Sequence, residues 1–334
     1  MSVKGRIIPV FVPHLGCPRG CVFCNQRRIS GSLSQPDAAA VAETIREGIL
    51  KNPEGSNIEL AFYGGSFTAI PTEKQCELLG AALPFLRAGQ ISSIRLSTRP
   101  DAIDEEILSR LRDYGVTTIE LGSQSMIDEV LELSKRGHTA RQTEHAARLI
   151  KEHGFKLVLQ MMTGLPGDTK ERCIETAKRI IALEPDGVRI YPTVIVSDTE
   201  LCDMWRRGEY DEHTVEEAVD YCSAILPLFE EAGIAVIRLG LNPTEELSAG
   251  AALGGAYHPA LGELVRSRIM LNRARTLLKD RELGESLVLE VNPAQLSQMI
   301  GQGRKNVDIL KAEFGFSSVF VKGVDTPKGN ILIK

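Results

Sequence analysis

The chain has 334 residues, of which 43% are hydrophobic and 25% charged, a composition typical of a soluble globular protein with one large and one small domain. The net charge of −5 argues against nucleic-acid binding by bulk charge alone, and no run of 18 apolar residues predicts a membrane span. The N-terminal apolar stretch is too short for a signal peptide and seven cysteines fit a reducing compartment, so we expect a cytoplasmic protein with no membrane partner.

Short apolar runs alternate with amphipathic stretches from residue 6 to about residue 240. The predicted strands are Ile7–Val12, Ile58–Tyr63, Ile91–Ser97, Thr117–Leu121, Lys156–Met162, Gly187–Tyr191 and Ile234–Leu239. The predicted helices are Ala38–Lys51, Thr72–Arg87, Asp104–Tyr114, Thr139–His153, Lys170–Leu183 and Thr214–Ala232. The strand runs are rich in Val, Ile and Leu without strict alternation, which indicates a buried parallel sheet in an α/β fold. In such folds the loops that follow the strands carry the chemistry.

The first of these loops contains a C-x3-C-x2-C array formed by Cys17, Cys21 and Cys24. Thiolates prefer zinc, copper(I) or iron–sulfur clusters. A structural zinc site has four closed ligands, so a zinc site completed by His14 is one alternative. On a four-iron cluster, three cysteines would leave one iron open to a substrate or cofactor.

Polar or glycine-rich segments also follow the later strands. Gly64 and Gly65 after the second strand would let the backbone approach a ligand closely, although a tight turn is the plain alternative. The segment after the fifth strand contains Gly-Leu-Pro-Gly, a bend before a helix that Asp168 or Thr169 would cap.

The cysteine array, with Phe23 just before the third cysteine, and the ordered segments after it resemble the radical S-adenosylmethionine (SAM) superfamily. The similarity covers residues 6 to about 240 and is strongest to the branch of the Elongator catalytic subunit, with oxygen-independent coproporphyrinogen oxidase more distant. It implies a partial (β/α)6 radical SAM barrel, a [4Fe-4S] cluster held by the three cysteines, and S-adenosyl-L-methionine on the open iron. The acetyltransferase domain of the Elongator subunit has no counterpart here, so acetyl-CoA-dependent chemistry is not implied.

The resemblance also implies a set of SAM-binding residues: Gly64, Gly65 and Ser66 for the amino group, Ser97 and Gln124 for the ribose, Arg136 for the carboxylate, and Gln160 and Gly164 in the segment beside the adenine. Ser66 and Ser97 stand where relatives carry acidic residues. An arginine fork matches a carboxylate bidentately, which suits Arg136. Arg189 and Tyr191 end the sixth predicted strand, a position that would let them face the substrate, with a solvated Arg189 as the equal alternative. No role is predicted for them or for His258.

Residues 241–283 are expected to link the core, residues 1–240, to a tail domain, residues 284–334. A loop at Gly254–Pro259 is expected to be able to cover the barrel mouth. A helix after this loop carries Arg266, Arg268, Arg273, Arg275, Lys279 and Arg281, with Asp280 as the acidic residue of that span. A charge run of this kind is usually a solvated face.

The tail has a strand, two helices joined by a glycine loop, and two further strands. Gly301, Gln302, Gly303, Arg304 and Lys305 form this loop and resemble the GxxG loop of KH domains, which clamps a nucleic-acid backbone. Arg304 replaces the second glycine. Residues 284–334 carry six basic and five acidic side chains, against an acidic remainder. The alternative is a small α+β module for packing or dimerisation.

Together these features predict a cytoplasmic radical SAM enzyme that modifies RNA, with tRNA as the leading candidate and an electron donor such as flavodoxin or ferredoxin. One alternative is a radical SAM enzyme acting on a small molecule, with a structural tail. Another is an RNA-binding or assembly factor with a structural cluster. Cys76, Cys173, Cys202 and Cys222 are expected to be packing residues, although a second cluster built from them is also open. The oligomeric state is not predicted.

Overall fold

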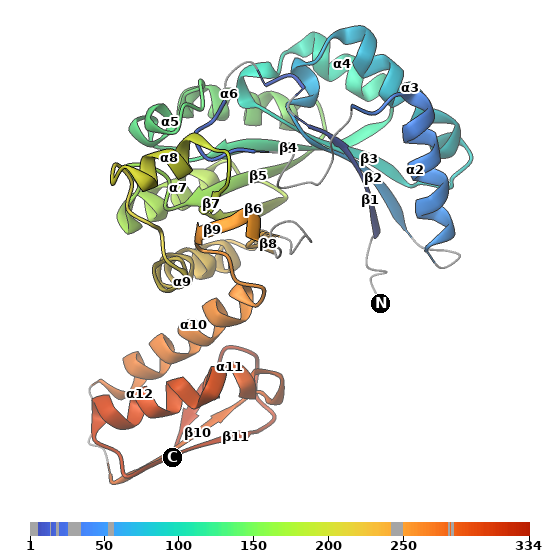
Figure 1. Ribbon diagram of the computed structural model, residues 1–334. Helices are drawn as coiled ribbons and strands as arrows, with labels where there is room; N and C mark the ends of the chain where they lie inside the picture. The colour runs from blue at the N-terminus through green and yellow to red at the C-terminus, as the bar shows by residue number, and fades with distance from the viewer. Residues whose placement is uncertain are drawn as a thin grey trace.

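A curved parallel sheet forms the larger part of the protein in the computed structural model, which describes residues 6–13, 15–17, 20–25, 35–52, 57–241, 250–279, 281 and 284–334. Its seven strands are β1 (Arg6–Val12), β2 (Ile58–Gly64), β3 (Ser93–Thr98), β4 (Val116–Gln124), β5 (Lys156–Thr163), β6 (Gly187–Pro192) and β8 (Ala235–Leu239). They follow one another in the order β1-β2-β3-β4-β5-β6-β8, and every neighbouring pair is parallel. The sheet curls into a half-barrel, so the predicted α/β barrel fold is confirmed (Figure 1).

Helices cover the outer face of the sheet (Figure 1). They are α2 (Ala38–Leu50), α3 (Thr72–Arg87), α4 (Glu105–Asp113), α6 (Ala140–Glu152), α7 (Lys170–Ala182) and α9 (Val215–Glu231). Five begin at a side chain that accepts a hydrogen bond from the first turn: Asp37, Asp104, Thr139, Thr169 and Thr214. Such caps satisfy amide groups that the helix leaves unbonded, which explains why the sequence predicted these helices within a few residues.

Several short elements were not predicted. They are η1 (Phe67–Ala69), η2 (Pro100–Ala102), α5 (Asp128–Leu133), β7 (Val194–Val196), α8 (Glu200–Arg206) and β9 (Ala252–Gly255). The prediction of a loop at residues 254–259 was wrong in its first part, because Gly254 and Gly255 belong to β9, which pairs antiparallel with β7. Gly255 has φ +84°, and an added Cβ would lie 2.7 Å from the carbonyl oxygen of Thr193. The close approach of β7 therefore requires glycine there.

The tail is a second, smaller layer of helices and strands at the end of α10 (Leu261–Leu278) (Figure 1). It contains β10 (Ser286–Val291), η4 (Pro293–Gln295), α11 (Leu296–Ile300), η5 (Gln302–Arg304), α12 (Lys305–Phe314), β11 (Ser318–Gly323) and β12 (Ile331–Ile333). β10 is central, parallel to β11 and antiparallel to β12. The small α+β domain after the barrel is thus present.

Helix α10 joins the two hydrophobic cores. Val265 in its first half is buried in the barrel core, whereas Leu271 and Leu278 in its second half are buried in the tail core. The last turns of α10 therefore pack as part of the tail, although they precede residue 284, the predicted boundary. No helix over the described ranges combines the length and the apolar character that crossing a membrane requires.

Candidate functional site

The loop after β1 that carries Cys17, Cys21 and Cys24, called the cysteine loop below, is held against the barrel by the buried side chain of Val22. This side chain is 1% exposed and packs in an apolar cluster with Leu201 and Tyr210. Its amide donates to the carbonyl of Ser134 at 3.3 Å, and the amide of Leu201 donates to the carbonyl of Val22 at 2.7 Å. The ends of α5 and α8 therefore hold the loop between Cys21 and Cys24.

A second contact joins the cysteine loop to the glycine segment after β2. The amide of Gly65 donates to the carbonyl of Val12 at 2.7 Å, and that of Ser66 donates to the carbonyl of Leu15 at 3.1 Å. A Cβ added at Gly65 would lie 2.1 Å from the carbonyl oxygen of Leu15. A Cβ added at Gly16 would lie 2.2 Å from the carbonyl oxygen of Ser66. Glycine is required at both positions because two backbones touch, so the Gly65 requirement follows from protein packing.

Two guanidinium groups lie beside the thiols. Arg136 is 7% exposed and donates through Nη1 to Sγ of Cys21 at 3.1 Å and through Nη2 to the carbonyl of Gly122 at 2.6 Å. Burial and the neighbouring Cys21 raise the pKa of Cys17, and the positive charges of Arg99 and Arg136 oppose that rise. Positive charge beside thiols favours thiolates, which are the form that binds an iron–sulfur cluster.

Buried polar atoms without partners gather after β4. Oε1 of Gln124, Nε of Arg136 and Nδ1 of His138 have no hydrogen-bond partner among the described residues. Gln124 is 5% exposed and has a positive φ of 62°, which is uncommon for a non-glycine residue. Since buried polar groups are nearly always bonded, this acceptor oxygen, guanidinium N–H and imidazole nitrogen are suited to a polar ligand, and the assignment of that ligand as SAM stays a prediction.

The three thiols also fit a cluster chemically, although they do not form a closed ligand set. Over the described part of the chain, no three histidine, cysteine, aspartate or glutamate side chains lie close enough together to hold a metal ion. The assignment of Cys17, Cys21 and Cys24 as ligands therefore rests on their chemistry and spacing and stays a prediction. His14, the alternative zinc ligand, lies outside the described residues.

The two serines of the predicted SAM site face protein partners. Ser66 is 1% exposed; its hydroxyl lies 2.9 Å from that of Thr98 and accepts the amide of Arg99 at 3.2 Å. Ser97 Oγ lies 3.5 Å from the carbonyl of Phe62. Ser66 thus ties the loops after β2 and β3 together, and a contact of either hydroxyl with SAM stays a prediction.

The turn after β5 is supported by residues that the sequence did not indicate. Gly164 has φ +72°, and an added Cβ would lie 2.1 Å from Cγ of His213. Tyr210 donates to the carbonyl of Gly164 at 2.6 Å, and Nε2 of His213 lies 3.1 Å from the hydroxyl of Thr163. His213 and Tyr210 come from the segment between α8 and α9, some fifty residues later in the chain, so no local pattern could reveal them. Thr169 caps α7, as one of the two predicted caps.

A buried ionic network spans the inside of the barrel. Glu120 on β4 is 2% exposed and accepts from Nη1 of Arg95 at 2.8 Å, from Nε of Arg189 at 2.8 Å and from the hydroxyl of Tyr63 at 3.1 Å. Arg95 also bonds Glu59. Arg189 is 9% exposed and paired with Glu120, so the alternative of a solvated Arg189 was wrong, whereas its orientation toward a substrate stays a prediction. Charged residues inside apolar strands were the signal that could have indicated this network.

The glycine loop of the tail protrudes from a fixed base. Gln302, Gly303, Arg304 and Lys305 are exposed, while Asn306 is buried and donates through its side-chain amide to the carbonyls of Ser267 and Gln298 at 3.0 and 3.1 Å. An added Cβ at Gly301 would lie 2.9 Å from the amide of Asn306. Gly301 is therefore needed for the turn. Arg304 adopts a left-handed φ of 65°.

Most arginines of the basic helix are paired within the protein. Arg266 bonds Glu230 at 3.0 Å, Arg268 bonds Glu216, and Arg275 bonds Glu313. The fourth, Arg273, donates to the carbonyl of Gly329 at 3.2 Å. Carboxylates of α9 and α12 thus neutralise part of this basic run, while Arg266, Lys279 and Arg281 are exposed as the sequence indicated. Asp280 lies outside the described residues.

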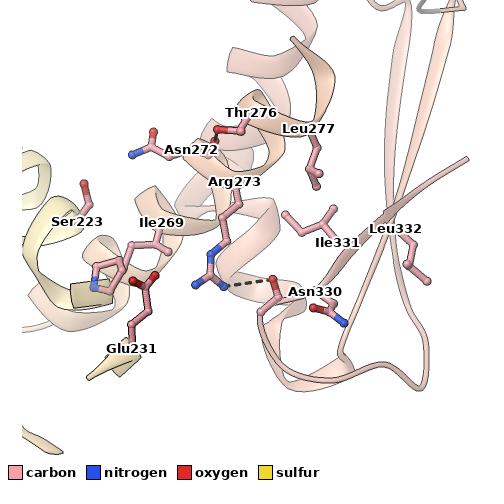
Figure 2. A pocket seen from close by; sticks show the side chains of 12 residues that line it. Ser223, Glu231, Ile269, Asn272, Arg273, Thr276, Leu277, Asn330, Ile331 and Leu332 are labelled. Carbon is pink, nitrogen blue, oxygen red and sulfur yellow. Dashed lines mark hydrogen bonds between the residues drawn. The ribbon is translucent and has the colours of Figure 1, made fainter. Parts of the chain in front are cut away.

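A groove of about 530 Å³ lies where α9, α10 and β12 meet (Figure 2). Glu231 lines it from α9, Arg273 from α10, and Ile331 from the tail. None of its lining residues comes from the strand ends that carry the cysteine loop or the SAM-binding candidates. The groove is thus separate from the candidate site.

The remaining cysteines and His258 have structural positions. Cys173, Cys202 and Cys222 are buried and Cys76 is half-buried, in agreement with their interpretation as packing residues. Nδ1 of His258 accepts the amide of Ala260 at 3.0 Å, just before α10.

Comparison with known proteins gives two family matches. Residues 11–180 match the radical SAM superfamily, and residues 185–270 match the radical SAM C-terminal domain. The chain is 28% identical over 303 residues to tRNA uridine(34) acetyltransferase of Methanocaldococcus jannaschii, covering 78% of this chain and 54% of the relative. It is 32% identical over 237 residues to an uncharacterized protein of the same organism, covering 67% and 70%. It is 32% identical over 208 residues to Elongator complex protein 3 of Homo sapiens, covering 61% and 37%.

Solved structures show the same fold. Elp3 of Methanocaldococcus infernus superposes with a TM-score of 0.62 at 25% identity, covering 84% of this chain and 65% of that one. Coproporphyrinogen III oxidase of Escherichia coli gives a TM-score of 0.51 at 19% identity, covering 69% and 53%, which speaks for the fold alone. The chain spans about half the length of the tRNA uridine(34) acetyltransferases that it matches.

Replacing Glu120 with Gln should destabilise the protein by about 3–5 kcal/mol, because two buried guanidinium groups would lose their shared counter-ion. Urea unfolding at pH 7 measures this loss. The matched control is Glu43→Gln, which breaks an exposed pair with Arg46 and should change stability by less than about 0.5 kcal/mol. A loss below about 1 kcal/mol for Glu120→Gln would show that Glu120 is not the centre of the network.

Stability should fall as the pH is lowered from about 6.5 to 4, in part because of His213. Burial lowers the pKa of His213 to about 4, so the unfolded chain binds this proton at a higher pH than the folded chain does. Acid therefore favours the unfolded state. Over this pH range the free energy of unfolding of His213→Gln should fall by up to about 3 kcal/mol less than that of the wild type. Urea unfolding at several pH values tests it, with exposed His145→Gln as the control. Equal pH slopes for wild type and His213→Gln would contradict the assignment.

Proposed function

The chain belongs to the radical SAM superfamily, and from this we propose that it is an enzyme that modifies RNA, with tRNA as the leading substrate class. Radical SAM enzymes use a [4Fe-4S] cluster and SAM, and this chain offers residues that fit both. The observation that carries the proposal is the meeting of the cysteine loop with the strand ends, where Arg136 contacts Cys21 and buried polar atoms have no partner among the residues that the structure describes.

In this proposal Cys17, Cys21 and Cys24 hold the cluster. SAM binds over the strand ends with Gly64, Gly65, Ser66, Ser97, Gln124, Arg136, Gln160 and Gly164 as its candidate contacts. When bound, these two groups supply one-electron cleavage of SAM and a radical able to take a hydrogen atom from a substrate.

In this proposal the chain's own residues bind and orient the cluster and SAM. Arg136 and Arg99 add positive charge beside the thiols, which offsets the negative charge of thiolate ligands. Gln124 is buried, its side-chain oxygen has no hydrogen-bond partner among the described residues, and its backbone adopts a positive φ that is uncommon for a non-glycine residue. An electron donor such as flavodoxin or ferredoxin belongs to the proposal as well.

Two features support RNA as the substrate. The loop Gly301–Lys305 projects four exposed residues, two of them basic, from a base fixed by Asn306. A KH-like loop of this kind meets backbone phosphates, and the target base would have to leave its stack to reach the barrel. In addition, a relative covering 78% of the chain is named a tRNA uridine(34) acetyltransferase. Acetyl transfer itself is not proposed, because the chain spans about half of that relative.

A small-molecule substrate is the second candidate. It is favoured by the pairing of Arg266, Arg268 and Arg275 with carboxylates, which removes much of the free positive charge expected beside the tail. The RNA proposal then depends on the glycine loop rather than on α10.

Replacing Cys17, Cys21 or Cys24 with Ala should abolish both the bound cluster and the formation of 5′-deoxyadenosine from SAM. Iron content and absorbance of anaerobically reconstituted protein, followed by chromatography of the reduced reaction, measure both. Cys76→Ser is the control and should keep full iron. A triple alanine variant that retains four irons, or stoichiometric zinc in protein isolated without oxygen, would refute the ligand assignment.

Two loop variants should weaken RNA binding without unfolding the tail. Gln302→Glu places a negative charge on the exposed loop and should raise the Kd for total tRNA several-fold. Arg304→Gly removes one cation at a left-handed position that glycine adopts freely, and should lower the log–log salt slope by about 0.7. Filter binding at several salt concentrations measures both.

The control for these variants is Gln90→Glu, which adds the same charge to an exposed turn of the barrel. It should bind RNA like the wild type. Salt-insensitive binding that neither loop variant changes, or no binding by the wild type, would make the tail a packing module and favour the small-molecule candidate.

A further inference from the structure

Three polar side chains form one row across the last strands of the half-barrel. Gln160 on β5 is aligned with Arg189 on β6, and Arg189 is aligned with Arg238 on β8. Aligned residues of neighbouring strands point to the same face of a sheet. Arg189 bonds Glu120 and Tyr63, which lie on β4 and β2, so this face is the inside of the barrel.

The charges along this inner face do not balance. The carboxylates of Glu59 and Glu120 are shared by Arg95 and Arg189. Arg238 adds a third guanidinium beside Arg189, and it forms no hydrogen bond or ion pair with any residue that the structure describes; its Nε is buried without a partner. Like charges on adjacent strands are destabilising, so this arrangement calls for an anion.

Arg238 lies on β8, the last strand of the seven-stranded sheet, and its side chain is half-buried, so part of it is open to solvent over the described part of the chain. Tyr191 on β6 lies within range of both guanidinium charges; burial raises the pKa of its hydroxyl, and Arg189 and Arg238 oppose the rise. The hydroxyl is thus protonated at neutral pH and able to donate a hydrogen bond. Gln160 is half-buried and adds an amide donor.

We propose that Arg238, with Tyr191 and Gln160, binds an anionic oxygen group of the substrate beside the edge strand β8, which assigns Gln160 to the substrate rather than to SAM. A guanidinium fork, a phenol and an amide together match a phosphate or a carboxylate, both of which offer several acceptor oxygens. The inference deepens the proposed function, because it assumes that the substrate enters the barrel. The anion is either a phosphate of an RNA nucleotide or the acid group of a small molecule.

Thermal unfolding of the anaerobically reconstituted holoprotein tests this site without any turnover. The wild type, Arg238→Met, Arg238→Lys and the control Arg141→Met are compared in potassium phosphate, acetate and chloride at equal ionic strength. Arg141 is exposed on α6, so its loss matches the charge change outside the barrel. The wild type and the control should gain a few degrees of Tm in phosphate or acetate relative to chloride, because an anion bound to the folded state stabilises it. Arg238→Met should gain none.

A rise of Tm in phosphate but not in acetate identifies the bound group of the substrate as a phosphate. A rise of Tm in both identifies it as a carboxylate. Both results support the site. The same gain in Arg238→Met as in the wild type, or no anion-specific gain in the wild type, overturns it. A gain that vanishes once SAM is bound would assign Arg238 to SAM and also overturn it. Should Arg238→Met fail to fold, Arg238→Lys decides. This variant should need at least twice the anion concentration that the wild type needs to reach half of its gain in Tm. An equal concentration for both proteins refutes the proposal.

Neither RNA nor SAM cleavage enters this measurement. A failure here therefore leaves the RNA proposal standing, and a failure of the RNA tests leaves the anion site standing with a small-molecule source.

Discussion

The sharing of one buried carboxylate by two guanidinium groups is the constraint on which the inside of this barrel depends. Glu120 is bonded by Arg95, Arg189 and Tyr63, so strands β2, β3, β4 and β6 are tied together across the concave face. Removing charges from water is costly, and such a group is tolerated only when every partner is in place. The inner face of the barrel is therefore polar and preorganised, while the outer face packs on helices through apolar side chains.

The cysteine loop depends on a different constraint, the direct contact of two backbones. Glycine at positions 16 and 65 lets the segment after β1 touch the segment after β2, and Val22 fixes the far side of the loop against α5 and α8. The thiols thereby come to lie beside Arg136 and the unpartnered atoms after β4. Chemistry for a cluster and chemistry for SAM are thus brought to one end of the sheet.

The tail is coupled to the barrel through α10. Its first half is buried in one core and its second half in the other, and Asn306 bonds the carbonyl of Ser267 on α10 at the base of the glycine loop. A rigid helix shared by two cores gives the loop a defined position relative to the barrel. The ion pairs of Arg266 and Arg268 join α10 to α9, so these guanidinium groups are paired within the protein rather than free for phosphate contacts.

The sequence by itself determined the features that depend on neighbours in the chain. Apolar runs predicted the seven strands, capping residues such as Thr139 and Thr169 predicted helix starts, and the spacing of Cys17, Cys21 and Cys24 indicated the family. The tertiary structure alone decided which charges meet. Arg189 pairs with Glu120 across 69 residues, Tyr210 supports Gly164 across 46, and Arg238 is left without a partner among the described residues. These outcomes depend on strand register and on the curl of the sheet, which bring distant residues together and which no local periodicity encodes.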